Sequence, residues 1–389
     1  MQWSHHYDIH DIITISSQAE LPELARFRTV TPLRRPTIRV CMGVADHSPR
    51  QWRTLNSRGF SRLAYDEIAA GAGLHRFQYD ERLGSLGFKA EITMGDPIDV
   101  VASPVLKYSP HVLYTNLVEP ILRWTFVRKG WALVHGATVS FGDRAYMITA
   151  KTDTGKTTTL LLMLNKQRRG TDSAAFISDD LTLVAPDGTV LTYPKPMTIS
   201  QHTLHAVNSE TLPWGLRMVL PFQSRIHSRE GRKFALALAQ TKLPMATINT
   251  LVQFVVPPPK YHVTQLVPNA KLGHRAKLAG LFVIERGGEG EIRLDNKEAL
   301  ETLLSNCDDA YGFPPYHTIK EFLYKREDTD LRQVERSIVT QAFAELPATL
   351  VRSTTSDWWR RIPNLVNEGV AQYFAPRPQP ALALGAVHS

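Results

Sequence analysis

The sequence has very little cysteine and no long apolar run. Cys41 and Cys307 are too few and too far apart, in 389 residues, for a disulfide framework or a zinc site. No stretch approaches the roughly 20 apolar residues of a membrane span, and the first ten residues do not resemble a signal sequence. These features argue against disulfide-stapled and membrane-spanning classes, so we expect a cytoplasmic protein with no transmembrane segment.

Acidic residues are also scarcer than basic ones. The 37 Asp and Glu stand against 45 Lys and Arg, which leaves a net charge of +8. This excess favours an anionic partner, which could be a nucleotide, a phosphorylated metabolite, a nucleic acid or a lipid surface. A hydrophobic content of 43% is typical of a packed globular protein. The length suits two domains, or one large domain with appendages, and we find no internal repeat.

The most informative stretch is residues 144–180. Its apolar run 145–149 predicts a strand, residues 156–167 predict a helix, and the loop between them fits the pattern A/G-x4-G-K-S/T. Strand, loop and helix are the context that a nucleotide-binding phosphate loop requires. In such a loop Lys156 reaches the β- and γ-phosphates, the Thr157 hydroxyl holds Mg²⁺, and backbone N–H groups bind phosphate oxygens. The predicted cofactors are ATP and Mg²⁺, and the predicted nucleotide contacts are Ala150, Lys151, Thr152, Asp153, Thr154, Gly155, Lys156, Thr157 and Thr158. The alternative is a glycine-capped structural turn.

Asp153 stands where most such loops carry a middle glycine. Aspartate tolerates positive φ better than most residues, but its charge is unfavourable beside a triphosphate. Either Lys151 neutralises this charge, or the acceptor uses Asp153 as a hydrogen-bond partner.

Two adjacent carboxylates follow the next predicted strand. If residues 174–177 return to the same sheet as a parallel strand, Ser178, Asp179 and Asp180 lie at its carboxyl end beside the loop. Open α/β sheets bind their ligands at this edge. One carboxylate can then hold Mg²⁺, for which we assign Asp180 together with Thr157, while the other serves the incoming hydroxyl. The alternative is an Asp pair that starts a turn.

Two hairpins accompany these motifs. Residues 138–141 form one with the loop strand, and 181–185 with 190–193 form another around a Pro-Asp-Gly turn. The motifs are, in order, His-Gly-Ala at 135–137, a hairpin, the phosphate loop, Ser-Asp-Asp-Leu at 178–181, an Asp-Gly turn and Pro-x-Pro at 194–196. This order resembles the catalytic domain of HPr serine kinase/phosphorylase. That domain is related to phosphoenolpyruvate carboxykinase.

The resemblance implies an α/β fold with a P-loop-containing mixed sheet of the HPr kinase type. It implies an ATP-dependent kinase that transfers the γ-phosphoryl group to a hydroxyl of a protein serine, a peptide or a small molecule. Asp179 would accept or orient the acceptor proton, and His135 would belong to the site, although a buried structural histidine is the alternative. A non-catalytic nucleotide-binding regulatory protein and a carboxykinase-like lyase are the rival functions. The sequence leaves the oligomeric state open, a homo-oligomer included.

We expect four parts: an N-terminal α/β lobe (1–115), a catalytic domain (116–310), a helical appendage (311–373) and a disordered tail (374–389). Expected strands elsewhere are 37–42, 98–102, 250–256 and 278–285, and expected helices are 62–70, 116–129, 297–304, 333–346 and 358–370. One basic run comprises Arg26, Arg28, Arg34, Arg35 and Arg39, and it either docks a partner or an acidic membrane or is a solvated surface. A second basic stretch, 225–233, either clamps phosphate or is a solvated loop.

Overall fold

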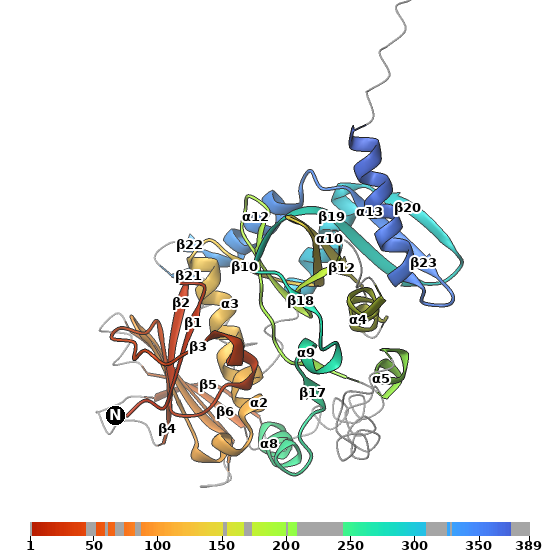
Figure 1. Cartoon of the computed structure of the whole chain (residues 1–389). Helices are drawn as coiled ribbons and strands as arrows, with labels where there is room; N and C mark the ends of the chain where they lie inside the picture. Colours follow the sequence, from red (N-terminus) through yellow and green to blue (C-terminus); the bar gives the residue numbers. More distant parts are fainter. Residues whose placement is uncertain are drawn as a thin grey trace, which may run out of the picture.

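Two large β-sheets with helices packed on them make up the computed structural model of the chain (Figure 1). The structure describes residues 2–43, 52–58, 61–66, 74–81, 87–150, 154–166, 173–199, 201–207, 244–308, 325–326 and 329–374. None of the helices in these ranges has the length and apolar character needed to cross a membrane.

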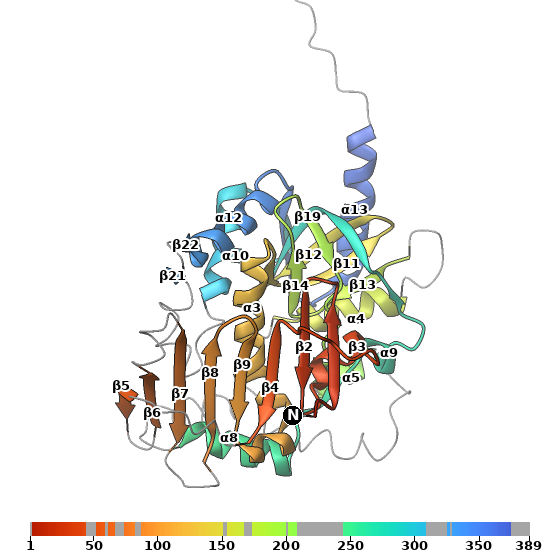
Figure 2. The same ribbon diagram turned by 90° about the vertical axis from the view of Figure 1, so that its left-hand side faces the viewer.

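The first sheet is built from the N-terminal residues and has nine strands in the order β3-β1-β2-β4-β9-β8-β7-β6-β5 (Figure 2). All neighbours are antiparallel except the β2–β4 and β4–β9 pairs. The strands are β1 (His5–Ile9), β2 (Ile13–Ser17), β3 (Arg28–Thr29), β4 (Ile38–Met42), β5 (Trp52–Arg58), β6 (Ser61–Asp66), β7 (His75–Glu81), β8 (Lys89–Met94) and β9 (Ile98–Ala102).

Short helices and one longer helix cover this sheet on the side that faces the second sheet (Figure 1). They are η1 (Pro22–Phe27), η3 (Pro104–Tyr108), α2 (Pro110–Leu113), a π-helical turn η4 (Tyr114–Val118) and α3 (Glu119–Arg128). The apolar side chains of α3 join the same buried cluster as β1, β2 and β4. Gly130, with φ of 79°, follows the end of α3 in the left-handed conformation that glycine adopts readily. This cluster therefore includes residues on both sides of position 115.

The second sheet has ten strands. Its main order is β10-β14-β15-β19-β12-β11-β13-β18, β23 pairs in parallel with β19, and β20 pairs with β23. The strands are β10 (Ala132–His135), β11 (Ala137–Phe141), β12 (Arg144–Thr149), β13 (Ala175–Ser178), β14 (Leu181–Val184), β15 (Thr189–Leu191), β18 (Lys271–Leu272), β19 (Arg275–Arg286), β20 (Gly290–Leu294) and β23 (Ala348–Ser353).

Helices pack on both faces of this second sheet. Along β12, Tyr146 and Ile148 face α4 (Lys156–Lys166) and α13 (Trp358–Phe374), while Ala145 and Met147 face the opposite side. That side is covered by α10 (Asn296–Asp308) and α12 (Leu331–Phe343). This alternation is the period of two that a strand buried on both faces requires. The remaining described elements are β16 (Met197–Thr198), α5 (Gln201–Val207), α8 (Met245–Val255), β17 (Lys260–Tyr261), α9 (Val263–Leu266), β21 (Lys325–Arg326) and β22 (Thr329–Asp330).

The structure confirms the predicted α/β class and the elements around the predicted phosphate loop. The strand before the loop, the helix after it and both hairpins lie where the sequence places them. The strand before the aspartates runs parallel to β12 as predicted, but β11 lies between the two because it pairs antiparallel with each. The late strand β19 and the helices α10, α12 and α13 are also confirmed.

Two secondary-structure predictions are wrong. Residues 62–66 belong to strand β6, because β5 and β7 hydrogen-bond to them on both sides. Residues 250–255 belong to helix α8, although their β-branched, apolar composition favours a strand. The Glu81 carboxylate accepts hydrogen bonds from the N–H groups of Ala246 (2.8 Å) and Thr247 (2.6 Å) at the start of α8. A cap from so distant a residue is not visible in the local sequence.

The C-terminal part of the chain is also more than a set of helices. Strand β23 extends the second sheet next to β19, and its apolar side chains complete the buried clusters on both faces. The predicted tail beyond residue 374 and the basic stretch 225–233 lie outside the described residues.

Candidate nucleotide and phosphoryl-transfer site

The candidate site lies at the carboxyl ends of β12 and β13. Strand β12 ends at Thr149, and α4 begins at Lys156 directly after Gly155, whose φ is 131°. Such a φ is unfavourable for any residue with a Cβ, so glycine is required there. Lys151, Thr152 and Asp153, three of the predicted nucleotide contacts, lie outside the described residues.

Two neighbouring elements support the described part of the loop. Arg286, the last residue of β19, donates from Nε to the carbonyl of Thr154 (3.3 Å). The indole of Trp358 lies so close to Gly155 that a Cβ there would meet it at 3.3 Å. Trp358 is fully buried and donates from Nε1 to the carbonyl of Val351 (2.9 Å).

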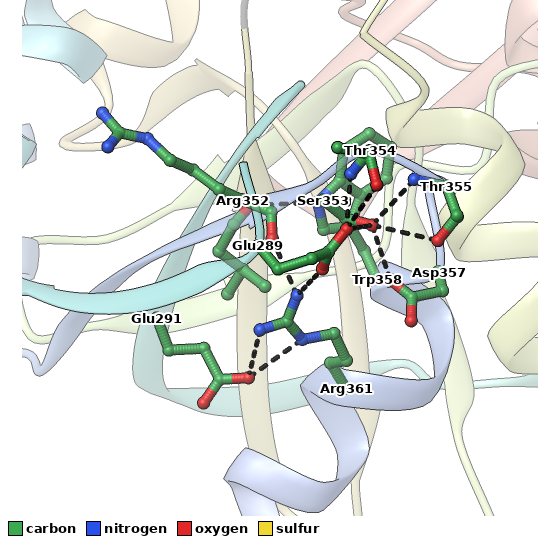
Figure 3. Close-up of polar contacts among 10 residues, drawn as sticks. Glu289, Glu291, Arg352, Ser353, Thr354, Thr355, Asp357, Trp358 and Arg361 are labelled. Carbon is green, nitrogen blue, oxygen red and sulfur yellow. Dashed lines mark hydrogen bonds and ion pairs between the residues drawn. The ribbon is translucent and has the colours of Figure 1, made fainter. Parts of the chain in front are cut away.

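Polar contacts fix the start of α13, which carries Trp358 (Figure 3). The Glu289 carboxylate, between β19 and β20, accepts from the backbone N–H and the hydroxyl of Thr354, both at 2.7 Å. Arg361 of α13 donates to Glu289 (2.6 Å) and to Glu291 (2.8 Å). The start of α13, and with it the Trp358 side chain behind the loop, is therefore held in place by Glu289 and Glu291.

Lys156 and His135 are brought into direct contact. The Lys156 Nζ lies 2.6 Å from His135 Nε2 and 3.4 Å from the carbonyl oxygen of Ala150. Burial lowers the pKa of His135; Asp180 acts to raise it and Lys156 to lower it, and the net shift is downward. The imidazole is therefore neutral at neutral pH, so that Nε2 accepts from the ammonium and Nδ1 carries the proton. His135 Nδ1 lies 3.5 Å from Asp180 Oδ1.

Thr157 contacts Asp179. Its hydroxyl donates to the two carboxylate oxygens of Asp179, at 3.2 and 3.0 Å. The prediction paired Thr157 with Asp180 at the metal, but among the described contacts the threonine meets only the first aspartate. Thr158, a predicted nucleotide contact, instead shares a hydrogen bond with Thr203 of α5 (3.0 Å).

The two aspartates have opposite environments. Asp179 is only 5% exposed, and burial together with the charge of Asp180 raises its pKa to about 7. The Asp180 side chain is 55% exposed and its backbone φ is 71°, in the left-handed region. The surrounding protein acts to raise the pKa of Asp180, but the ammonium groups of Lys195 and Lys156 outweigh this and hold the pKa below its usual range. At neutral pH, Asp180 is therefore charged.

Sequence reasoning missed two residues of this site, Lys195 and Glu119. The Lys195 Nζ lies 2.6 Å from Glu119 Oε2 on α3 and 3.6 Å from Asp180 Oδ2. Glu119 and Asp180 raise the pKa of Lys195 although burial acts to lower it. The only signal in the sequence was the Pro-x-Pro motif, because Lys195 is its central residue; nothing marked Glu119.

The residues present fit a magnesium ion between Thr157 and Asp179. Two oxygens in cis positions on an octahedral Mg²⁺ with bonds of about 2.1 Å lie about 3 Å apart. The Thr157 and Asp179 oxygens show this spacing, at 3.0 and 3.2 Å. In the described ranges no group of three or more His, Cys, Asp or Glu gathers as a metal site. A magnesium ion that takes its other ligands from phosphates and water does not need one.

Comparison of the sequence with protein-family models finds no match, and comparison with curated proteins finds none either. The case for a function therefore rests on the residues of this chain.

Proposed function

We propose that the protein is an ATP-dependent kinase that transfers the γ-phosphoryl group to a hydroxyl acceptor. The observation that carries the proposal is the meeting of Lys156, Thr157, Asp179 and Asp180 at one sheet edge, although they come from two separate strand ends. The HPr kinase type of fold, inferred from motif order, is part of this proposal.

The contacts favour the reverse of the predicted roles, which assigned Mg²⁺ to Asp180 and the acceptor hydroxyl to Asp179. Asp179 is buried and bonded to Thr157, so it suits the metal. Asp180 is half exposed and charged, so an acceptor hydroxyl can reach it. Bound Mg²⁺ would supply charge stabilisation for the phosphates. Asp180 would then orient the hydroxyl and accept its proton, a positioning role that phosphoryl transfer needs more than a strong base.

Lys156 is the residue that must meet the nucleotide. In the structure its ammonium contacts the neutral His135 ring and the Ala150 carbonyl. Its charge also acts on the carboxylates of Asp179 and Asp180. His135 keeps the ammonium near Asp180, which keeps the positive charge where the transferred group would lie. A charge-stabilising group fixed in advance costs no reorganisation during the reaction.

The test compares Mg-ATP binding and ADP formation in the wild type and in Lys156→Ala. Calorimetric titration with Mg-ATP should show binding that the variant loses by about tenfold or more, since it loses a direct charge contact. The matched control is Lys166→Ala, which removes an exposed lysine from the other end of the same helix α4.

Three outcomes separate the rival functions. Binding with slow ADP formation that candidate hydroxyl acceptors accelerate supports a kinase. Tight binding with no turnover under any condition supports the non-catalytic regulatory protein. Equal ATP affinity in the wild type and Lys156→Ala would overturn the nucleotide site itself.

A further inference from the structure

A cleft of about 480 Å³ lies where the two sheets meet, away from the phosphate loop. One wall is formed by the β1–β2 turn and by β3, and the other by residues 192–194 and β18. We call it the edge cleft. Its volume falls within the range of about 300–1,000 Å³ that ligand sites occupy.

Each wall of the cleft contains an edge strand of its sheet. Strand β3 is the last strand of the nine-stranded sheet, and β18 is the last strand on its side of the ten-stranded sheet. The Gly273 N–H donates to the Phe176 carbonyl on β13 (2.8 Å), so the N–H and C=O of the preceding Leu272 point away from β13. Leu272 lines the cleft, and its edge pairs with no further strand among the described residues. An open edge of this kind can accept an extended peptide as an added strand.

The edge leads toward the aspartates of the phosphoryl-transfer site. Ser178 and Tyr193 form a parallel bridge, and the Tyr193 N–H donates to the Ile177 carbonyl (3.1 Å). The residues that follow each of them therefore run side by side, which brings Lys195 to Asp180 (3.6 Å). Pro194 lines the cleft one residue before Lys195. A chain lying along this edge would be directed to Asp180.

The turn at the end of the β1–β2 hairpin closes one side of the cleft with unusual backbone geometry. His10 and Asp11 have φ values of 57° and 58°, which hairpin turns normally assign to Asn and Gly. For a residue other than glycine, this backbone conformation costs free energy, and residues in such conformations are common at binding sites. His10 Nε2 donates a hydrogen bond to the Thr192 carbonyl on the opposite wall (2.7 Å), and the His10 ring lies edge-on to Phe27. The turn thus joins the two walls of the cleft.

Charges of both signs line the opening. Arg26 and Arg28 line one wall, Asp8 belongs to β1 and Asp11 belongs to the β1–β2 turn. Arg26 donates to Thr264 (3.0 Å) and Arg28 lies 3.8 Å from Glu20, and both contacts are at the exposed surface. A mixed lining selects against a polyanion and favours a segment that carries both an acidic and a basic side chain.

We propose that the edge cleft binds an extended peptide segment of a partner protein by strand addition to β18, with an acidic side chain at Arg26 and Arg28. Binding in the cleft stands independently of any reaction. The further statement, that the segment presents a hydroxyl to Asp180, rests on the proposed kinase function.

The probe is an array of synthetic random octapeptides, each with one serine, incubated with the full chain. The best binder is then labelled with fluorescein and titrated by anisotropy. The double variant Arg26→Glu/Arg28→Glu should bind it about tenfold more weakly or worse, because two cations at the opening become anions. Arg34→Glu/Arg35→Glu, the same charge change at exposed positions outside the cleft, should bind as the wild type does.

Backbone pairing is tested separately with the same peptide methylated at alternate amide nitrogens. One methylation frame should abolish binding and the other leave it, because only alternate N–H groups of an added strand face its neighbour. No octapeptide binding, no effect of the cleft variant, or no effect of either methylation frame would overturn the proposal. Binding that meets these criteria without phosphorylation of the peptide would refute the statement that the segment presents its hydroxyl to Asp180 and leave the cleft assignment intact. The kinase function itself is overturned by the Mg-ATP titration of Lys156→Ala and not by this result.

Discussion

At the scale of single residues, the adjacent pair Asp179 and Asp180 shows how environment separates two identical side chains. Burial raises the pKa of the first, and cations hold the second below its usual range. Pairs of carboxyl groups whose pKa values are moved apart are typical of sites that divide two tasks between them. Substitution of Asp179 or Asp180 by asparagine keeps the shape of the side chain and removes the carboxylate.

We expect Asp180→Asn to keep Mg-ATP affinity and to lower kcat by about 10² to 10⁴, the usual range for a positioned proton acceptor. Asp179→Asn should instead raise the Mg²⁺ concentration needed for half-maximal activity by about tenfold or more. Steady-state kinetics at varied Mg²⁺ measure both. Asp187→Asn, an exposed carboxylate in the β14–β15 turn, is the control. The reverse pattern would restore the roles first predicted from the sequence.

Glu23 is a second carboxylate whose charge the fold stabilises. It is 2% exposed, and it accepts from His111 Nδ1 and Lys260 Nζ, both at 2.7 Å. Burial acts to raise its pKa, but these partners lower the pKa of Glu23 below the usual value. A lowered pKa in the folded state stabilises the fold above the unfolded value of about 4.3, and this contribution is lost as the pH falls through the folded pKa.

The expected result for Glu23→Gln is a loss of about 3 kcal/mol of unfolding free energy at pH 7, because a buried cation loses its partner. The difference from the wild type should shrink as the pH falls below about 4.3. Urea unfolding at several pH values gives both quantities. Glu20→Gln, three residues away and exposed, should change little. A difference that does not depend on pH would mean that packing, and not charge, is responsible.

At this scale the sequence was most informative where a motif has fixed spacing. Lys156, Thr157 and the two aspartates could be named because a strand and a helix force them to one edge. Glu119 and Lys195 are 76 positions apart, and they meet only because α3 packs beside the turn that follows β15. No local pattern encodes that contact.

At the scale of elements, the proposed phosphate loop depends on α13, which follows it by about 200 positions in a chain of 389 residues. The Trp358 indole packs against Gly155, and the contacts of Glu289 and Arg361 hold the start of α13 in place. The sequence predicted α13 as part of a helical appendage, and did not predict β23. Strand β23 was missed because Ala348–Ser353 is a short run with only partial alternation, and its pairing with β19 supplies what its own sequence lacks.

Gly155→Ala should weaken Mg-ATP binding and cost about 1 to 3 kcal/mol of stability, since an alanine at this φ is strained and its Cβ would press on Trp358. Gly142→Ala is the matched control. It also has positive φ, 62°, but a Cβ there meets nothing within 4 Å and lies in a turn away from the loop. It should cost about 1 kcal/mol and leave ATP affinity unchanged. Equal ATP affinity in the two variants would mean that the loop tolerates a side chain at this point.

At the scale of the whole molecule, α3 connects the two sheets. Its apolar face belongs to the core of the N-terminal sheet, while Glu119 at its start holds Lys195 beside Asp180. Arg123, one helical turn later, is buried and donates to the Leu133 carbonyl (2.8 Å) on β10 of the second sheet. The predicted division at residue 115 stays a prediction, but the contacts give the N-terminal sheet a direct influence on the site.

A double-mutant cycle measures this connection. Lys195→Met should destabilise the fold by about 3 kcal/mol or more, because it leaves the largely buried Glu119 carboxylate without its cation. Glu119→Gln should cost less, because Lys195 keeps its 3.6 Å contact with Asp180. The double variant should be less destabilised than the sum of the two, with a coupling of about 1 to 3 kcal/mol by urea unfolding. Additive effects would show that the 2.6 Å contact contributes nothing of its own.

The segment 192–195 presents alternate residues in different directions. The Tyr193 and Tyr114 hydroxyls share a hydrogen bond and Lys195 lies 3.6 Å from Asp180, while Thr192 and Pro194 line a wall of the edge cleft. A ligand that changes the position of this short segment therefore also moves the Lys195 ammonium relative to Asp180. Thermodynamic linkage makes the effect reciprocal: whatever factor a cleft ligand applies to nucleotide affinity, the nucleotide must apply to the affinity of the cleft ligand. The protein would then respond to two molecules jointly through four residues of backbone.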